Sequence, residues 1–146
     1  MKNIKVLMID DNVELVKMVK EYFSNHENID ISLEAYDGVE GMKLIKDNQD
    51  DYDVVILDLI MPHKDGVSIL EEMKQLGIDK KVIVLTSYNT QDMIRKVSEL
   101  GIVYFILKPF ELSELEKRIL ECMGENNYSN KSIDVYKNKK WYKIKC

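Results

Sequence analysis

Five polar residues that could act on phosphate lie where short apolar runs of the sequence end. They are Asp10 and Asp11, Asp58, Thr86 and Lys108, and the runs before them are 4–9, 54–57, 82–85 and 103–107. Three carboxylates brought to one place repel each other and raise a pKa unless a cation lies among them. Oxygen ligands suit Mg2+, which typically binds one or two carboxylates, several waters and a substrate phosphate. The residue types therefore predict a magnesium site that works on phosphate.

Asp58 is the predicted nucleophile, because an aspartate can attack phosphorus and form an aspartyl-phosphate. Lys108 would supply a positive charge to the phosphoryl oxygens, and the Thr86 hydroxyl would donate a hydrogen bond to them. Each residue also has a purely structural alternative. Asp10 and Asp11 could cap a helix, Lys108 could be an exposed loop lysine, and Thr86 could bond to its own backbone. Their joint placement at four strand ends favours a common site, since no structural need requires that combination.

The elements that would bring these residues together are five strand-helix units. The four apolar runs, with a weaker one near 29–35, indicate buried strands, and apolar residues at three- and four-residue spacing predict a helix after each strand. Expected helix caps are Asn12, Asp37 and Thr90, and helices should stop at Gly77 and Gly101. Strict alternation implies a parallel sheet with helices on both faces, a doubly wound sandwich. Ligands of such sheets bind outside the carboxyl ends of the strands, where all five candidates map.

The length and charge limit the class of protein. A chain of 146 residues fits one domain, and its net charge of -5 argues against a general nucleic-acid binder, which needs a basic face. Residues 125–146 hold six lysines against two acids, a balance of +4 that leaves the preceding residues at -9. This tail lacks a clear helical period. We expect a solvated, disordered extension, with a basic arm that touches nucleic acid or an acidic partner as the alternative.

Cysteine use and hydropathy indicate the compartment. The two cysteines, Cys122 and Cys146, have no spacing typical of a metal site or a disulfide framework, which favours a reducing compartment. No apolar stretch approaches the roughly 18 residues of a membrane helix, and the first residues lack the apolar segment of a signal peptide. We therefore expect a soluble cytoplasmic protein without a membrane partner.

The constellation resembles the receiver domain of two-component response regulators over about residues 3–123. The likeness is carried by Asp10-Asp11-Asn12, by the pattern D-x-x-M-P-x-x-D-G from Asp58 to Gly66, by Thr86-Ser87 and by Lys108-Pro109-Phe110. The resemblance implies an α/β fold of the flavodoxin-like type. That fold is a doubly wound (βα)5 three-layer sandwich with a five-stranded parallel sheet in the order 2-1-3-4-5. The receiver domain would span residues 1–124, and 125–146 would be a basic C-terminal tail or linker.

The resemblance also implies a role for each site residue. Asp58 is the implied phosphoacceptor, assisted by Thr86 and Lys108. The implied Mg2+ ligands are Asp10, Asp11, Asp58 and the backbone carbonyl of Ile60. The implied switch residues are Thr86 and Phe105, and Tyr88 lies where its side chain would screen the phosphoryl group from water.

A phosphorelay receiver is the function that the resemblance implies. The donor would be phosphohistidine on a histidine kinase or a histidine phosphotransfer protein, and the output a changed face that binds a downstream effector protein or domain. A dimer that forms on phosphorylation is one such output, whereas direct DNA binding by this chain is not expected. The chain would not be an enzyme beyond self-catalysed phosphoryl transfer and autodephosphorylation.

Within that family, the chain most resembles receivers of the stage-zero sporulation type from spore-forming Firmicutes. The segments that carry this likeness are 6–22, 60–66 and 104–110. Such regulators continue into a DNA-binding domain, whereas these residues end in the basic tail, so a stand-alone receiver, a truncated paralogue and an excised fragment all stay open.

Two other functions are alternatives. A phosphorylation-independent interaction module would keep the fold and signal through binding alone. A metal-dependent phosphatase would need an acid where the chain has Ile60, and no obvious general acid replaces it. His63 is expected to be an ordinary loop residue, because nothing near it in sequence orients it as a catalytic imidazole. The isomer of the Lys108-Pro109 bond is left open by the sequence.

Overall fold

A computed structural model of the chain describes residues 3–87, 90–102, 104–124 and 132–145. Its helices and strands alternate from the first strand to the last helix, and two strands follow. In chain order they are β1 (Ile4–Ile9), α1 (Val13–Phe23), β2 (Ile29–Ala35), α2 (Gly38–Asp47), the 3-10 turn η1 (Gln49–Asp51), β3 (Val54–Leu57), α3 (Gly66–Gln75), β4 (Lys81–Thr86), α4 (Gln91–Glu99), β5 (Tyr104–Leu107), α5 (Leu112–Cys122), β6 (Ser132–Lys137) and β7 (Lys140–Lys145).

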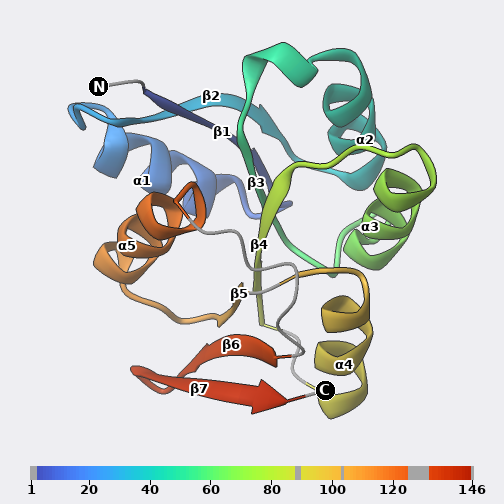
Figure 1. Cartoon of the computed structure of the whole chain (residues 1–146). Helices are drawn as coiled ribbons and strands as arrows, with labels where there is room; N and C mark the ends of the chain where they lie inside the picture. Colours follow the sequence, from blue (N-terminus) through green and yellow to red (C-terminus); the bar gives the residue numbers. More distant parts are fainter. Residues whose placement is uncertain (1–2, 88–89, 103, 125–131, 146) are drawn as a thin grey trace.

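The strands form one sheet in the order β2-β1-β3-β4-β5-β6-β7. The first five are parallel and follow the predicted order 2-1-3-4-5, so the flavodoxin-like prediction is confirmed. Helices α1 and α5 pack on one face of the sheet, and α2, α3 and α4 pack on the other (Figure 1). Both faces are therefore covered, which is why β3 reads Val-Val-Ile-Leu and is buried at every position.

Local signals set the helix ends as predicted. The side chains of Asn12, Asp37 and Thr90 each accept a hydrogen bond from the backbone N–H three residues on, at 2.8 to 3.1 Å. Gly77 and Gly101 end α3 and α4 with φ of 68° and 91°, in the left-handed region that favours glycine. No helix among the described residues combines the length and apolar character needed to cross a membrane.

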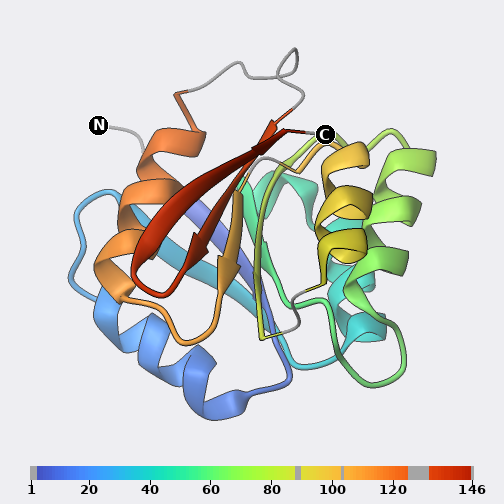
Figure 2. The same ribbon diagram turned by 90° about the horizontal axis from the view of Figure 1, so that it is seen from below.

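The tail differs from the prediction of a disordered extension, because residues 132–145 form a hairpin on the free edge of β5 (Figure 2). Ile133, Val135 and Tyr136 are almost completely buried and continue the two cores of the sheet. Only two residues, Asn138 and Lys139, separate the paired ends of β6 and β7, and both have positive φ (54° and 63°). That conformation matches the two-residue turn whose twist suits a hairpin. The tail has no helical period because its apolar residues Ile133 and Val135 alternate along a strand.

The connection that leads into the hairpin also departs from the handedness that is usual between parallel strands. Between β1 and β5, the connection that moves toward β2 has its helix on the α1 face of the sheet. The connections that move toward β5 have their helices on the other face, so all of these crossovers have the same handedness. The connection from β5 through α5 to β6 runs away from β2, yet α5 lies on the α1 face. This crossover therefore has the opposite hand, which is rare for parallel strands.

Candidate functional site

The carboxyl ends of four neighbouring strands meet at one edge and bring the predicted residues together. Asp10 follows β1, Asp58 follows β3, Thr86 ends β4 and Lys108 follows β5. These strands are paired in register, as shown by the backbone N–H of Asp58 donating to Ile9 and that of Lys108 donating to Thr86. Among the described residues, the buried polar side chains are Asp10, Asp58 and Thr86, which are 1%, 6% and 0% exposed. Burial of polar groups is costly, so their concentration at one edge marks a site rather than packing.

Three carboxylates form an acidic cluster at this edge. Asp10, Asp11 and Asp58 each offer an oxygen within 4.8 Å of the other two, and Asp11 is the exposed member. Burial raises the pKa of Asp10, and the Asp58 carboxylate raises it further. Hydrogen bonds from Lys108 and from the Asn12 backbone N–H act in the opposite direction. The cluster is thus open to solvent on the Asp11 side and closed on the other.

Lys108 lies among these carboxylates. Its Nζ is 2.8 Å from Asp10 Oδ2 and 3.4 Å from Asp58 Oδ2, and its side chain is 19% exposed. The Lys108-Pro109 bond, whose isomer the sequence left open, is cis. The lysine is therefore a partly buried cation shared by two buried acids, and the alternative of an exposed loop lysine is wrong.

The loop after Asp58 holds that aspartate through backbone contacts. Asp58 Oδ1 accepts a hydrogen bond from the N–H of Ile60, and the N–H of Gly66 donates to Leu59. A Cβ on Gly66 would lie 2.5 Å from the Asp58 carbonyl oxygen, so a larger residue there would displace the loop. His63 is exposed with φ of 72°, in agreement with an ordinary loop residue.

The two predicted switch residues lie on the same face of the sheet. Phe105 pairs with Val84, and Thr86 is two residues further along β4, so both side chains point toward the α4 side. Both are fully buried, and Phe105 also lies opposite Val135 of the hairpin. Tyr88, which was predicted to screen the phosphoryl group from water, lies outside the described residues.

Two contributions to the site were not anticipated from the sequence. Asp65 accepts a hydrogen bond from the Ser68 N–H at 2.8 Å and so caps α3 directly after the loop that follows Asp58, a signal visible as an aspartate before a helix pattern. Gly38, at the start of α2, would place a Cβ 1.7 Å from the Lys64 carbonyl oxygen. This close approach packs α2 against the same loop, and no local pattern reveals it.

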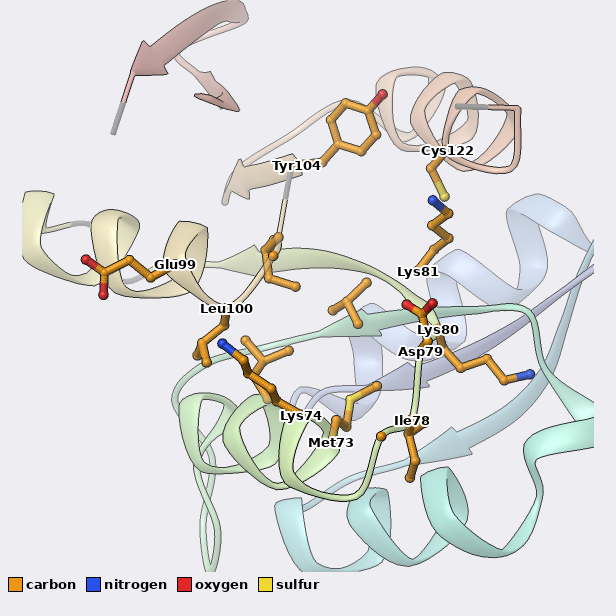
Figure 3. Close-up of a pocket in the computed structure, with 15 residues that line it drawn as sticks. Met73, Lys74, Ile78, Asp79, Lys80, Lys81, Glu99, Leu100, Tyr104 and Cys122 are labelled. Carbon is orange, nitrogen blue, oxygen red and sulfur yellow. The ribbon is translucent and has the colours of Figure 1, made fainter. Parts of the chain in front are cut away.

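One cavity is separate from this chemistry. It measures about 380 Å3 and lies at the opposite end of β4 and β5, between the ends of α3, α4 and α5 (Figure 3). Lys80, Leu100 and Cys122 are among its lining residues, and none of the acidic cluster reaches it. The site is therefore defined by burial and charge rather than by the size of a cavity.

A doubly wound sheet with buried acids, a hydroxyl and a lysine at its carboxyl edge is the architecture of a phosphoacceptor receiver. The chain belongs to the response regulator receiver domain family, whose sequence profile matches residues 6–120. It is a receiver of two-component signalling and a phosphoacceptor domain rather than a true enzyme. The match ends before β6, so the hairpin is an addition to the family's fold.

Solved structures agree with this assignment. The receiver domain of the Francisella response regulator 1452 is 31% identical, with a TM-score of 0.75, and the match covers 84% of this chain and 98% of that one. A CheX-CheY-BeF3-Mg2+ complex from Borrelia burgdorferi is 26% identical, with a TM-score of 0.76 and coverage of 84% and 90%. A response regulator receiver domain protein from Clostridium thermocellum is 27% identical, with a TM-score of 0.73 and coverage of 83% and 94%.

Proposed function

We propose that Asp58 accepts a phosphoryl group from phosphohistidine on a histidine kinase or a histidine phosphotransfer protein. The observation that carries this proposal is the burial of Asp10 and Asp58 around one lysine at the carboxyl edge of the sheet. Buried acids that share a cation are expensive to maintain, and they occur where charge is used. The similarity of the chain to a receiver solved with BeF3 and Mg2+ supports the same chemistry.

The acidic cluster fits Mg2+. Three carboxylate oxygens within 4.8 Å of one another form a hard oxygen donor set, and the exposed side of Asp11 leaves room for the waters that Mg2+ keeps. We assign Asp10, Asp11 and Asp58 as its ligands, with the backbone carbonyl of Ile60 as a fourth. The ion, when bound, would neutralise charge on the carboxylates and on the phosphoryl oxygens.

The transfer itself needs positioning more than covalent chemistry. An oxygen of the Asp58 carboxylate forms a bond to phosphorus while the bond from phosphorus to the donor imidazole nitrogen breaks, and the imidazole leaves with the electron pair. Lys108 lies within 3.4 Å of Asp58 and would hold the phosphoryl oxygens by charge. Thr86, at the end of the adjacent strand, would donate its hydroxyl to them.

The output would be a repacked face near β5. Phosphate at Asp58 adds strong acceptors that would draw Thr86 inward, and Phe105 lies on the same face of the sheet to follow it. Because Phe105 is opposite Val135, this repacking would reach the hairpin as well as α4. An effector protein or domain, or a second phosphorylated copy, would bind the changed face.

The wider context rests on the sequence alone. We assign residues 1–124 to the receiver domain and 125–146 to an appended basic segment, and we place the protein in a cytoplasmic phosphorelay. A sporulation-type regulator is the narrower assignment, supported only by the likeness of the segments 6–22, 60–66 and 104–110.

Phosphorylation by acetyl phosphate with Mg2+ tests the site. The wild-type chain should gain one phosphoryl group in an intact-mass measurement, and hydroxylamine should remove it because the product is an acyl phosphate. Asp58→Asn should gain none. Asp65→Asn is the matched control, since it removes a carboxylate from the same loop and keeps a good helix cap. Equal labelling of wild type and Asp58→Asn would refute the assignment of Asp58.

A further inference from the structure

The hairpin turn forms one wall of a groove beside the phosphoacceptor. The groove measures about 370 Å3 and is called here the tip groove. Its lining residues are Ser87, the β5–α5 loop from Leu107 to Glu111, and the turn from Tyr136 to Lys139. It thus joins a loop that belongs to the receiver fold and a turn that is an addition to it.

The tip groove adjoins the site that a donor must reach. Lys108 lines the groove and also contacts Asp58, and Ser87 directly follows Thr86. Asp58 is only 6% exposed, so a phosphoimidazole must enter from the open edge of the sheet. A protein that carries this imidazole would therefore cover the surface around the entrance, and the tip groove is part of that surface.

The charge of the tip groove is opposite to that of the domain. Residues 1–124 carry a net charge of -9, whereas Lys137 and Lys139 project at the turn and both are exposed. Within the described parts of the chain, neither of these lysines has an ion-pair partner, whereas Lys143 of the same hairpin pairs with Asp134. The lining of the groove also includes Leu107, Pro109 and Tyr136, so an acidic segment with some apolar side chains fits it best.

The turn is held firmly in place. The indole N–H of Trp141 donates to Glu114 of α5 at 2.8 Å, and the Arg118 guanidinium stacks 3.9 Å from the ring centroid. Trp141 pairs with Tyr136, directly beside the turn. A surface that is ordered before binding loses little conformational freedom when a partner docks, which favours its use in recognition.

We propose that the tip groove is a docking surface for an acidic segment of the phosphohistidine donor, with Lys137 and Lys139 as its specificity-determining residues. This proposal rests on the proposed function of Asp58. The lysines would steer the donor to the entrance and would not touch the phosphoryl group.

A nucleic acid is a poorer occupant of this surface. Two exposed lysines neutralise few phosphates, and affinity for duplexes depends on the number of phosphates that are neutralised. The remainder of the receiver, at -9, would repel the backbone on either side of the turn.

Phosphotransfer kinetics with the full chain test the proposal. The probe is the autophosphorylated kinase or phosphotransfer protein from the same cell that phosphorylates the wild-type chain fastest. Lys137→Glu/Lys139→Glu should lower kcat/KM for this transfer about tenfold at low salt, chiefly through KM, and the difference should shrink at high salt. Labelling by acetyl phosphate should stay within about twofold of wild type, because a small donor makes no use of the groove. Lys5→Glu/Lys43→Glu changes the net charge equally, at exposed positions of β1 and α2, and should transfer normally.

Several results would overturn the proposal. Transfer to the double variant at the wild-type rate would show that the lysines do not dock the donor. A loss of acetyl phosphate labelling as large as the loss of phosphotransfer would show that the lysines act on the phosphorylation site itself. Binding of a labelled DNA duplex by wild type but not by the variant would show that nucleic acid, not a donor protein, occupies the groove. Labelling by acetyl phosphate without transfer from any phosphohistidine protein would also overturn it. Failure of the chain to be labelled by any donor would instead contradict the role of Asp58.

Discussion

Replacing Lys108 by methionine tests how charge is balanced in the acidic cluster. Lys108 Nζ lies 2.8 Å from Asp10 and 3.4 Å from Asp58, and both carboxylates are buried. Methionine has a similar length and no charge, so Lys108→Met leaves the two acids facing each other without a cation. Mg2+ is the other cation that could neutralise them. We therefore expect the variant to depend on Mg2+ for stability much more than the wild-type chain does.

The expected loss of stability follows from the burial of the pair. Removing one partner of a buried ion pair costs about 3–5 kcal/mol, and the 19% exposure of Lys108 lets water relieve part of that cost. We expect Lys108→Met to lower the free energy of unfolding by about 2–3 kcal/mol near neutral pH without divalent cations. Lys96→Met is the matched control, because Lys96 and Glu71 form an exposed pair at 3.7 Å. Loss of such a pair costs about 0–1 kcal/mol.

The pH dependence of this loss has a definite sign. Burial raises the pKa of Asp10, while the hydrogen bond from Lys108 lowers it, so removing the lysine should raise that pKa further. A carboxyl whose pKa is higher in the folded than in the unfolded protein destabilises the fold when it is ionised, and protonation removes that cost. The deficit of Lys108→Met should therefore shrink as the pH falls toward the ordinary aspartate range near ~4.

Urea unfolding at constant ionic strength measures these effects, with either EDTA or Mg2+ present. A ligand at about 100 times its Kd stabilises the folded state by about 2.7 kcal/mol, so saturating Mg2+ should restore most of what Lys108→Met loses. Calorimetric titration should also show tighter Mg2+ binding to the variant, because no lysine competes for the carboxylates. A loss no larger than that of Lys96→Met, or equal stabilisation of both proteins by Mg2+, would refute this account of the charge balance.

Three further predictions concern the hairpin, the loop after Asp58 and the pH dependence of the wild-type chain. Trp141→Ala should lower the free energy of unfolding by about 3 kcal/mol, because it removes the hydrogen bond to Glu114 and the contact with Arg118. Tyr142 is exposed on the same strand, so Tyr142→Ala should lower it by less than ~0.5 kcal/mol; urea unfolding followed by circular dichroism measures both. Gly66→Ala should cost about 1–3 kcal/mol and slow acetyl phosphate labelling, because its Cβ would lie 2.5 Å from the Asp58 carbonyl oxygen; labelling at the wild-type rate would contradict this. Because burial raises the pKa of Asp10, lowering the pH from neutral should stabilise wild type relative to Asp10→Asn, and parallel stability curves would contradict that sign.

The site could be predicted from the sequence because parallel strands present their carboxyl ends at one edge. The prediction used only the position of each residue after an apolar run, because parallel pairing of the strands brings such positions together. The residues are Asp10, Asp58, Thr86 and Lys108. The distances among them could not be predicted in this way. That Lys108 reaches Asp10 more closely than Asp58 depends on how the β5–α5 loop packs, which involves residues nearly a hundred positions apart.

The hairpin could not be predicted by the same rules, and one of them argues against it. A sixth strand beside β5 requires a crossover through α5 of the rare hand, so the topology rule that orders the first five strands would reject it. Its first strand also shows only a short alternation, Ile133 and Val135 on either side of Asp134, which ends at the buried Tyr136. Edge pairing of this kind depends on which strand edge the folded sheet leaves free. The local pattern of apolar residues does not predict which edge that is.

An unfavourable crossover must be offset by contacts, and contacts hold both ends of the hairpin. At the far end Ile133 is fully buried in the core, and Lys143 pairs with Asp134 at the surface. At the turn end Trp141 donates a hydrogen bond to Glu114 and packs against Arg118 and Tyr136. These polar and ring contacts hold the turn whose residues line the tip groove. Covering the β5 edge needs only the apolar contacts, whereas the proposed docking of a donor also needs a turn that is ordered before binding.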